Sequence, residues 1–218
     1  QLELINKIEG FDISHTSGKN VSASCVSITK EGPNKKNYRI MNLKKDFNND
    51  YLALSEAIQR RCKNLQKNNL DLPEVILLDG GKGQLNTVKK NLDKIFLEKI
   101  KIISVSKGPN RKDKYDILHT GKNNYELTRK NEISKLVQLV RNESHRFAIN
   151  HHRKRRSKEM FSSSLDEIVG LGPKLKINLV RHFGGVDKVF EATLDDLKLA
   201  PGIGESKAKK IFYHLKNN

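Results

Sequence analysis

The chain has 218 residues, and its 42 Lys or Arg against 25 Asp or Glu give a formal net charge of +17 at pH 7. That length is enough for one large domain or two modest ones, each with its own core. No apolar run approaches the ~18 residues that a membrane-spanning helix needs, and no signal-peptide pattern opens the chain, so we expect a cytoplasmic protein without membrane contact. Because the sequence starts at Gln1, we expect it to be a piece of a longer protein.

The positive charge is spread over the whole chain. Residues 151–218 contain 14 basic and 8 acidic side chains, so the remaining residues are also basic. A polyanionic partner is therefore indicated, and nucleic acid is the commonest one. The alternative is a Lys- and Asn-rich surface without such a partner. Cys25 and Cys62 belong to no CxxC motif, which favours free thiols in a reducing compartment.

The first part of the chain predicts strands followed by a helix. Extended segments at 7–14, 21–29 and 37–43 are separated by turn residues, which is typical of a three-stranded antiparallel meander. Residues 50–65 then carry apolar side chains at helical spacing, with Asp50 as a plausible N-cap.

The pattern changes after Pro73. Residues 74–79 form a nearly continuous apolar run, typical of a strand buried on both faces, and a helix over 84–97 leads to a strand over 101–106. Such a β-α-β unit predicts two parallel strands. Residues 107–131 look like an excursion with two short extended pieces, and a last helix is expected from about Glu132 to the basic run at 151–158.

This order of elements predicts an α/β fold with a mixed five-stranded sheet and flanking helices, the ribonuclease H-like architecture. We expect this domain to cover residues 1–158, a linker at 159–164 and a second domain at 165–218.

The stretch VILLDGGKGQLNT (75–87) raises the question of a nucleotide loop. A Walker loop needs G-x-x-x-x-G-K followed by Ser or Thr, and a dinucleotide loop needs G-x-G-x-x-G; neither spacing is present. What remains is Asp79 at the carboxyl end of a central parallel strand, where α/β sheets open their ligand crevice. The glycines then form the turn, and Lys82 is a candidate phosphate contact.

Asp12 is a second carboxylate in an unusual place, between Phe11 and Ile13 in the first strand. An aspartate there is costly unless it is paired or bound to a metal. The first and fourth strands are neighbours in the predicted topology, so Asp12 and Asp79 are expected to share one metal; the alternative for each is a hydrogen-bonded turn or cap. On the last helix, His145 lies one turn beyond Arg141 and off the apolar stripe, which lets it reach the same point.

Two carboxylates and an imidazole suit phosphodiester hydrolysis with Mg²⁺ or Mn²⁺. A hard divalent cation prefers oxygen ligands, polarises the phosphate and lowers the pKa of a bound water, while the imidazole ligates or accepts a proton. Zinc is disfavoured, because neither cysteine has a ligand-spaced partner.

The tail repeats a short helix, a G-x-G turn and a longer helix. Its turns, 170–172 and 202–204, each precede a helix that starts with basic residues. This order is the helix-hairpin-helix pattern. In that motif, backbone amides at a helix N-terminus bind a phosphate without reading bases. A small helical protein–protein module is the alternative. We expect its core to contain Leu165, Ile168, Leu171, Ile177, Leu179, Val180, Val189, Phe190, Leu197 and Ile211.

With these motifs in hand, the chain resembles a known family. The segments FDISH, LLDGGKGQ, RNESHRFAINHHRKRRSK and GLGPK…PGIGESKA are similar in order and spacing to the C-terminal half of the UvrC family, the incision component of the excinuclease of bacterial nucleotide excision repair. The resemblance implies a ribonuclease H-like endonuclease that cuts 5′ to a lesion, followed by tandem helix-hairpin-helix motifs. It also implies UvrA and UvrB as partners in the pathway, and a second nuclease upstream of this segment.

The resemblance further implies catalytic roles for Asp12, Asp79 and His145, with Asp50 at a further acidic position of the family. The metal would be held by Asp12, Asp79 and His145. The expected contacts to damaged duplex DNA and to single-strand/duplex junctions are Lys82, Arg153, Lys154, Arg155, Arg156, Gly170, Gly172, Lys174, Gly202, Gly204 and Lys207. A solvated basic face is the alternative for residues 153–156.

A metal-dependent DNA endonuclease is the leading interpretation. Two others stay open: a non-catalytic DNA-binding module on the same scaffold, and a nuclease for RNA–DNA hybrids or branched junctions.

Overall fold

The computed structural model describes residues 5–16, 20–43, 49–108, 115–128, 131–166, 168 and 170–217. They form two compact units, Gln1–Ile149 and Asn150–Asn218. Within the described ranges, no helix combines the length and apolar character needed to cross a membrane. The expected linker at 159–164 lies inside the long helix α4 (Glu132–Asp166), after the division between the units rather than at it.

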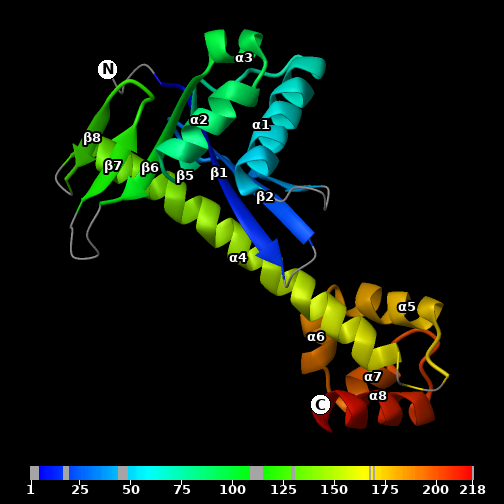
Figure 1. Ribbon diagram of the computed structural model, residues 1–218. Coiled ribbons are helices and arrows are strands. Elements are labelled where there is room, and N and C mark those ends of the chain that lie inside the picture. Colours follow the sequence, from blue (N-terminus) through cyan, green and yellow to red (C-terminus); the bar gives the residue numbers. More distant parts are fainter. Residues whose placement is uncertain are drawn as a thin grey trace. The chain divides into compact units, whose positions relative to one another are not determined.

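The first unit is built on one mixed sheet with helices on its faces (Figure 1), which confirms the predicted fold class. The strands are β1 (Lys7–Thr16), β2 (Asn20–Thr29), β3 (Gly32–Pro33), β4 (Arg39–Asn42), β5 (Val75–Asp79), β6 (Lys101–Lys107), β7 (Asp116–His119) and β8 (Asn124–Leu127). Their order is β3-β2-β1-β5-β6-β7-β8, with β4 paired to β2. The predicted antiparallel start and the parallel β1–β5–β6 centre are both present.

The sheet is larger than the five strands expected from the sequence. The segment interpreted as an excursion contributes the hairpin β7–β8, which pairs antiparallel with β6 and extends the sheet at that edge. Eight strands are thus present among the described residues. The physical reason is that β6 would otherwise leave its backbone N–H and C=O groups unpaired along a sheet edge.

Helices cover both faces of this sheet. The helices are α1 (Asp50–Lys67), α2 (Lys82–Asn91), α3 (Lys94–Lys99) and the first part of α4, with a short 3-10 turn, η2 (Lys35–Asn37). α1, α2 and α3 pack on one face and α4 on the other, as Figure 1 shows. The sequence predicted a single helix over 84–97, but the structure has two helices there. The backbone adopts an extended conformation at Leu92, which ends α2, and the Leu92 side chain is buried in the core.

Each face of the sheet has its own apolar core, since side chains alternate along a strand. Toward α1 and α2 lie Phe11, Cys25, Leu54, Ile58, Cys62, Ile76, Leu78, Leu85, Val88 and Phe96. Toward α4 lie Ile8, Val26, Ile28, Val75, Leu77, Val105, Leu127, Val137 and Val140. Both cysteines are buried free thiols, as predicted.

A charged pair lies inside the α1 side of this core. Glu9 is fully buried and Arg61 is 4% exposed. The guanidinium donates two hydrogen bonds to the carboxylate, from Nε at 3.1 Å and from Nη2 at 2.7 Å. Such a pair is stable only because both partners are satisfied, so it ties α1 to β1.

The second unit contains the end of α4 and α5 (Pro173–Phe183), α6 (Val186–Glu191), α7 (Leu194–Lys198) and α8 (Glu205–Asn217). Its core contains most of the predicted residues: Leu165, Ile168, Leu171, Leu179, Val189, Leu197 and Ile211 are buried, and Val180 and Phe190 pack against them. The prediction is wrong for Ile177, which is 58% exposed. It lies two residues before Leu179 in α5, so it points to a different side of the helix.

Candidate functional site

Asp12 and Asp79 lie side by side where the parallel pairing of β1 and β5 ends, Asp79 as the last residue of β5 and Asp12 within β1. In the β1–β5 register Gly10 lies opposite Leu77 and Phe11 opposite Leu78, so the next residues on the two strands are Asp12 and Asp79. Alternation along the strands puts both carboxylates on the face that α4 covers. The structure therefore brings together two carboxylates that are 67 residues apart in the sequence.

The surroundings of Asp12 disfavour its charged form. Burial raises the pKa of Asp12 above its ordinary value of 3.8, and the negative charge of Asp79 raises it further, while His145 and Arg141 oppose the shift. Because the charge of Asp79 raises the pKa of Asp12, the two carboxylates repel each other when both are charged. A cation placed between them would remove this repulsion.

Helix α4 comes unusually close to β1 at Gly10. A Cβ atom added to Gly10 would lie 2.3 Å from Val140 Cγ1 and 2.8 Å from Ser144 Oγ. Only a residue without a side chain allows this approach. Because Arg141 follows Val140 and His145 follows Ser144, the contact at Gly10 brings these two side chains close to Asp79 and Asp12, respectively. The expectation that the closing helix packs on the strand bearing Asp12 is confirmed.

His145 lies beside one of the two carboxylates. Its Nδ1 lies 3.9 Å from Asp12 Oδ2, too far for a hydrogen bond, and its side chain is 70% exposed. The ring is thus beside Asp12 and open to solvent. An imidazole in this position can exchange protons with water.

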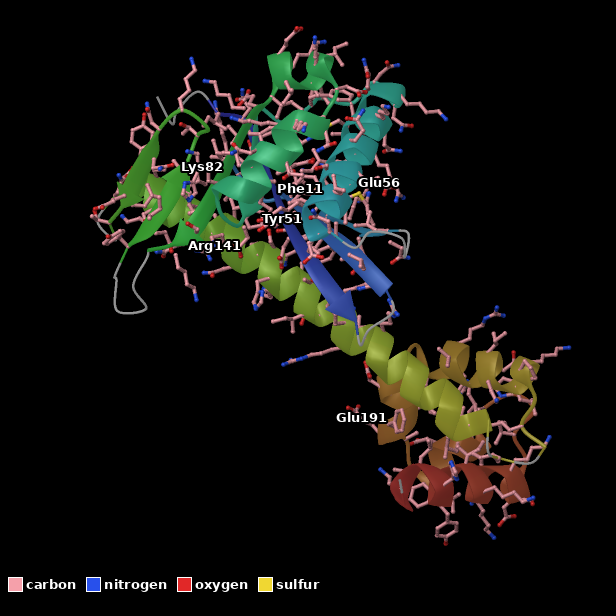
Figure 2. The ribbon with its side chains drawn as sticks, in the orientation of Figure 1. Phe11, Tyr51, Glu56, Lys82, Arg141 and Glu191 are labelled. Carbon is pink, nitrogen blue, oxygen red and sulfur yellow. The ribbon has the colours of Figure 1, made fainter. Side chains whose placement is uncertain are left out.

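Arg141 bridges two acidic side chains on the same face of the sheet. Its Nη2 lies 3.0 Å from Asp79 Oδ1, and its Nη1 donates a hydrogen bond of 3.0 Å to Asp116 Oδ2. Figure 2 marks Arg141 on α4, below the strands of the sheet, and Asp116 is the first residue of β7. All three side chains are partly buried.

Asp116 is a residue of this site that was not predicted from the sequence. It lies in KYDILHT, within the segment interpreted as an excursion. The signal that singles out Asp12, a carboxylate next to apolar residues in an extended segment, is also present here, because Ile117 and Leu118 follow Asp116. No role was predicted for Arg141 either. From the sequence, it was notable only because His145 lies one helical turn further along the chain.

The donor set fits a hard divalent cation. No set of three His, Cys, Asp or Glu side chains is arranged as a ready metal site among the residues that the structure describes. The mutual repulsion of Asp12 and Asp79 is nevertheless what a cation would relieve, and carboxylate oxygens are the ligands that Mg²⁺ and Mn²⁺ prefer. In this structure the positive charge beside Asp79 is that of Arg141.

Asp50 is not the N-cap of α1. The cap is Asn49, which has an extended backbone and whose Oδ1 accepts a 2.9 Å hydrogen bond from the amide of Tyr51. Asp50 is the exposed first residue of the helix, where a negative charge suits the helix dipole. The start of α1 lies near the turn after Asp79, since a Cβ on Gly83 would be 3.6 Å from the Tyr51 ring.

Lys82, labelled in Figure 2, is the first residue of α2 and is exposed. Among the basic residues of α4, Arg153 and Lys154 are exposed and Arg155 is half-buried. The side chain of Arg156 lies outside the described residues.

The two G-x-G turns of the second unit have the same backbone geometry. Gly170 and Gly202 have φ of +89° and +83°, a region that favours glycine. The next residue in each turn donates to the carbonyl three residues earlier, Leu171 to Ile168 at 3.1 Å and Ile203 to Ala200 at 3.0 Å. The predicted hairpin repeat is therefore confirmed.

Each turn leads into a helix whose first amides have no carbonyl one turn earlier to bond. Gly172 caps α5, and Gly204 precedes α8; nothing lies within 4 Å of a Cβ placed on either glycine. Lys174 is exposed and Lys207 half-buried near these helix starts. An open helix start next to lysines can accept a phosphate.

Comparisons with known proteins agree with these observations. Residues 1–149 match the family described as the UvrC RNAse H endonuclease domain, and residues 162–217 match the SAM-like helix-hairpin-helix tandem family. The chain is 38% identical over 98% of its length to the UvrABC system protein C of Pseudomonas putida strain KT2440, and 40% identical over 97% to that of Legionella pneumophila strain Lens.

The chain spans about a third of those curated relatives, 36% and 34% of their lengths. Among solved structures, Ciona intestinalis endonuclease V in complex with a 24mer DNA containing an inosine followed by a ribo-adenosine is 21% identical, with a TM-score of 0.34, over 51% of this chain and 49% of that one. The match over residues 1–149 covers more than half of the sequence. The chain belongs to the UvrC RNase H endonuclease domain family.

Proposed function

We propose that residues 1–149 cut the damaged DNA strand 5′ to a lesion in bacterial nucleotide excision repair, while the hairpins of the second unit hold the DNA backbone. The observation that carries this proposal is the side-by-side placement of Asp12 and Asp79 where the pairing of β1 and β5 ends, with His145 3.9 Å from Asp12. This combination supports phosphodiester hydrolysis, because it offers cation ligands and a proton acceptor at one point.

Each residue has a distinct role in the proposed reaction. Asp12 and Asp79 would hold Mg²⁺ or Mn²⁺, and His145 would act either as a third ligand or as the proton acceptor. When bound, the cation polarises the scissile phosphate and lowers the pKa of a water molecule. With its ring free of the cation, His145 would accept the proton of the attacking water, because the ring is exposed and next to Asp12. Asp50, the first residue of α1, is a further acidic residue proposed for this site.

The second unit would bind DNA through its backbone. The open amides at Gly172 and Gly204 suit two phosphates, and Lys174 and Lys207 add attraction that depends on salt. Lys82, at the start of α2, and the basic side chains Arg153, Lys154, Arg155 and Arg156 of α4 would contact further phosphates. Contacts of this kind position the protein without reading sequence, as binding at a lesion or a single-strand/duplex junction requires.

The activity of the whole protein goes beyond this chain. UvrB is the expected partner at the incision step, after UvrA has acted, and the cytoplasm of a bacterium is the expected location.

The proposed domains are residues 1–158 and 165–218. Deleting residues 165–218 should weaken DNA binding and leave the fold of the first domain intact, and an unfolded remainder would refute the two-domain proposal.

The test is cleavage of a lesion-bearing duplex that already carries the 3′ nick. The protein is combined with UvrA, UvrB and Mg²⁺, and 5′ cutting is measured for the unaltered protein, Asp12→Asn and Asp79→Asn. Both substitutions keep the side-chain volume but remove a charge. We expect 5′ cutting to be lost in both, and unchanged cutting in either variant would refute the assignment of the site.

Two alternatives predict different results. A non-catalytic scaffold would show no Mn²⁺ between Asp12 and Asp79 in a crystal grown with that ion. A nuclease with another substrate would cut RNA–DNA hybrids or branched junctions faster than the lesion duplex. Comparing these substrates under one set of conditions decides between them.

A further inference from the structure

Arg141 is held by two acids that come from different strands. It hydrogen-bonds Asp116 of β7 and forms a close ion pair with Asp79 of β5. β7 pairs with β6, and β6 pairs with β5, so the two acids are two strands apart in the sheet. The hairpin β7–β8 therefore supplies a side chain to the site.

The contacts of Arg141 use its two terminal nitrogens separately. Nη1 contacts Asp116 Oδ2, and Nη2 contacts Asp79 Oδ1, each at 3.0 Å. An arginine beside a single carboxylate favours a fork, in which two N–H groups bond both oxygens of that carboxylate. Because Nη1 is bonded to Asp116, the planar guanidinium cannot place both of its terminal nitrogens on Asp79. The other possible fork would use Nε with Nη2, but Nε of Arg141 is buried without a hydrogen-bond partner, so Asp79 receives the Nη2 contact alone among the described residues.

Burial makes this arrangement firm. The side chains of Arg141, Asp79 and Asp116 are 19%, 31% and 18% exposed, so their attraction is screened less than that of a surface pair. Arg141 is also fixed at its base, because the neighbouring residue, Val140, is packed against Gly10 of β1. A guanidinium anchored at both ends has little freedom to turn toward Asp79.

We propose that Asp116 is a positioning residue for the metal site. It anchors Arg141 and so limits the guanidinium to one contact with Asp79, which leaves the other oxygen of that carboxylate for a divalent cation. This inference rests on the proposed function, since it concerns the cation held by Asp12 and Asp79. Arg141 competes with the cation for Asp79, and Asp116 sets how strongly it competes.

The test measures Mn²⁺ binding by isothermal titration calorimetry on the complete 218-residue chain. In Asp116→Asn the anchor is weakened, Arg141 can form a fork on Asp79, and Mn²⁺ affinity should fall roughly tenfold, as is usual for the loss of a residue that orients a metal ligand. In Arg141→Met the competitor is absent, so affinity should equal or exceed that of the unaltered chain. The double variant should behave like Arg141→Met.

Three variants serve as controls. Asp116→Glu keeps a carboxylate for Arg141 and should retain most of the affinity. Asp93→Asn makes the same charge change at a 51% exposed side chain that pairs with Lys63 of α1, on the other face of the sheet, and should bind Mn²⁺ normally. Thermal unfolding monitored by circular dichroism establishes that each variant is folded.

The outcomes separate this inference from the proposed function. Equal loss of affinity from Asp116→Asn with and without Arg141 would overturn it, because Asp116 would then act directly on the cation. Unchanged affinity in folded Asp116→Asn would overturn it while leaving the proposed function in place. If the unaltered chain bound no Mn²⁺, or if Asp12→Asn bound it normally, the inference and the proposed metal site would both be wrong.

Discussion

Gly10 is the point at which α4 rests on β1, and we predict that Gly10→Ala lowers both stability and strand cutting. The added Cβ would lie 2.3 Å from Val140 Cγ1, whereas carbon atoms in contact prefer about 3.5–4.0 Å. The helix and the strand must therefore separate by about 1–2 Å. Val140 cannot turn aside, because a β-branched side chain has few rotamers and this one is 1% exposed.

The expected magnitude follows from this overpacking. Inserting a methyl group into a filled core costs about 1–3 kcal/mol of unfolding free energy. The same displacement moves Arg141 and His145, which neighbour the two contact residues of α4. A misplacement of about 1 Å at a reacting centre can lower the rate by about 100-fold.

Urea denaturation followed by circular dichroism measures the stability, and the pre-nicked lesion duplex measures 5′ cutting. Gly83→Ala is the matched control: its Cβ would meet only Tyr51, at an ordinary 3.6 Å, and alanine is the better helix former. Combining Gly10→Ala with Val140→Ala should give a smaller loss than the two single losses added. A Gly10→Ala protein as stable and active as the unaltered one would refute the close packing of α4 on β1.

Three further predictions concern the core, the carboxylate and the hairpins. Arg61→Met should destabilise the first unit by no more than about 3–5 kcal/mol in urea denaturation, because the buried Glu9 would lose both hydrogen bonds of Arg61 and keep Lys7, at 3.4 Å, as its charged partner. Burial and Asp79 raise the pKa of Asp12, so the stability that Asp12 contributes at low pH is lost as the pH rises through its folded pKa. With chelator present, Asp12→Asn should therefore melt at a higher temperature than the unaltered chain at pH 7, and this advantage should disappear below pH 3.8. Gly202→Ala should weaken DNA binding measured by fluorescence anisotropy, because φ of +83° strains an alanine, whereas Gly185→Ala, in open space with extended backbone, should not.

Each of these has a result that contradicts it. An Arg61→Met protein of unchanged stability would mean that Glu9 is not held by this pair. A melting difference for Asp12→Asn that is independent of pH would remove ionisation as its cause. Equal DNA affinity for Gly202→Ala and Gly185→Ala would show that the hairpin geometry does not matter for binding.

The central strands and the first helix were predictable because their apolar patterns are local. The run at 75–78 is buried on both faces, and α1 follows the spacing expected for residues 50–65. The ends of helices were harder. α4 continues through 159–164, since its basic run and the residues after it contain no Gly or Pro to stop a helix before Gly170. The cap of α1 is Asn49 rather than Asp50, a difference of one residue between two side chains that both favour caps.

The hairpin β7–β8 could not be placed from the sequence, because its place depends on pairing with β6. Two short extended pieces separated by polar residues say nothing about which strand they join. Only the register, in which Lys107 lies opposite Asp116 and Val105 opposite Leu118, puts Asp116 on the face that α4 covers. A shift of one residue would turn Asp116 to the other face.

The acidic residues of this site can be recognised from the sequence, whereas Arg141 cannot. Asp12, Asp79 and Asp116 all lie at apolar strand positions, where an unpaired carboxylate is costly, so each can be nominated from its neighbours alone. Arg141 lies on a helix among polar residues, where a long basic side chain is ordinary. Its role follows only from the two 3.0 Å contacts, which join acids from β5 and β7. Carboxylates next to apolar residues in strands therefore indicate where such a site lies, whereas the structure is needed to find the arginine that pairs with them.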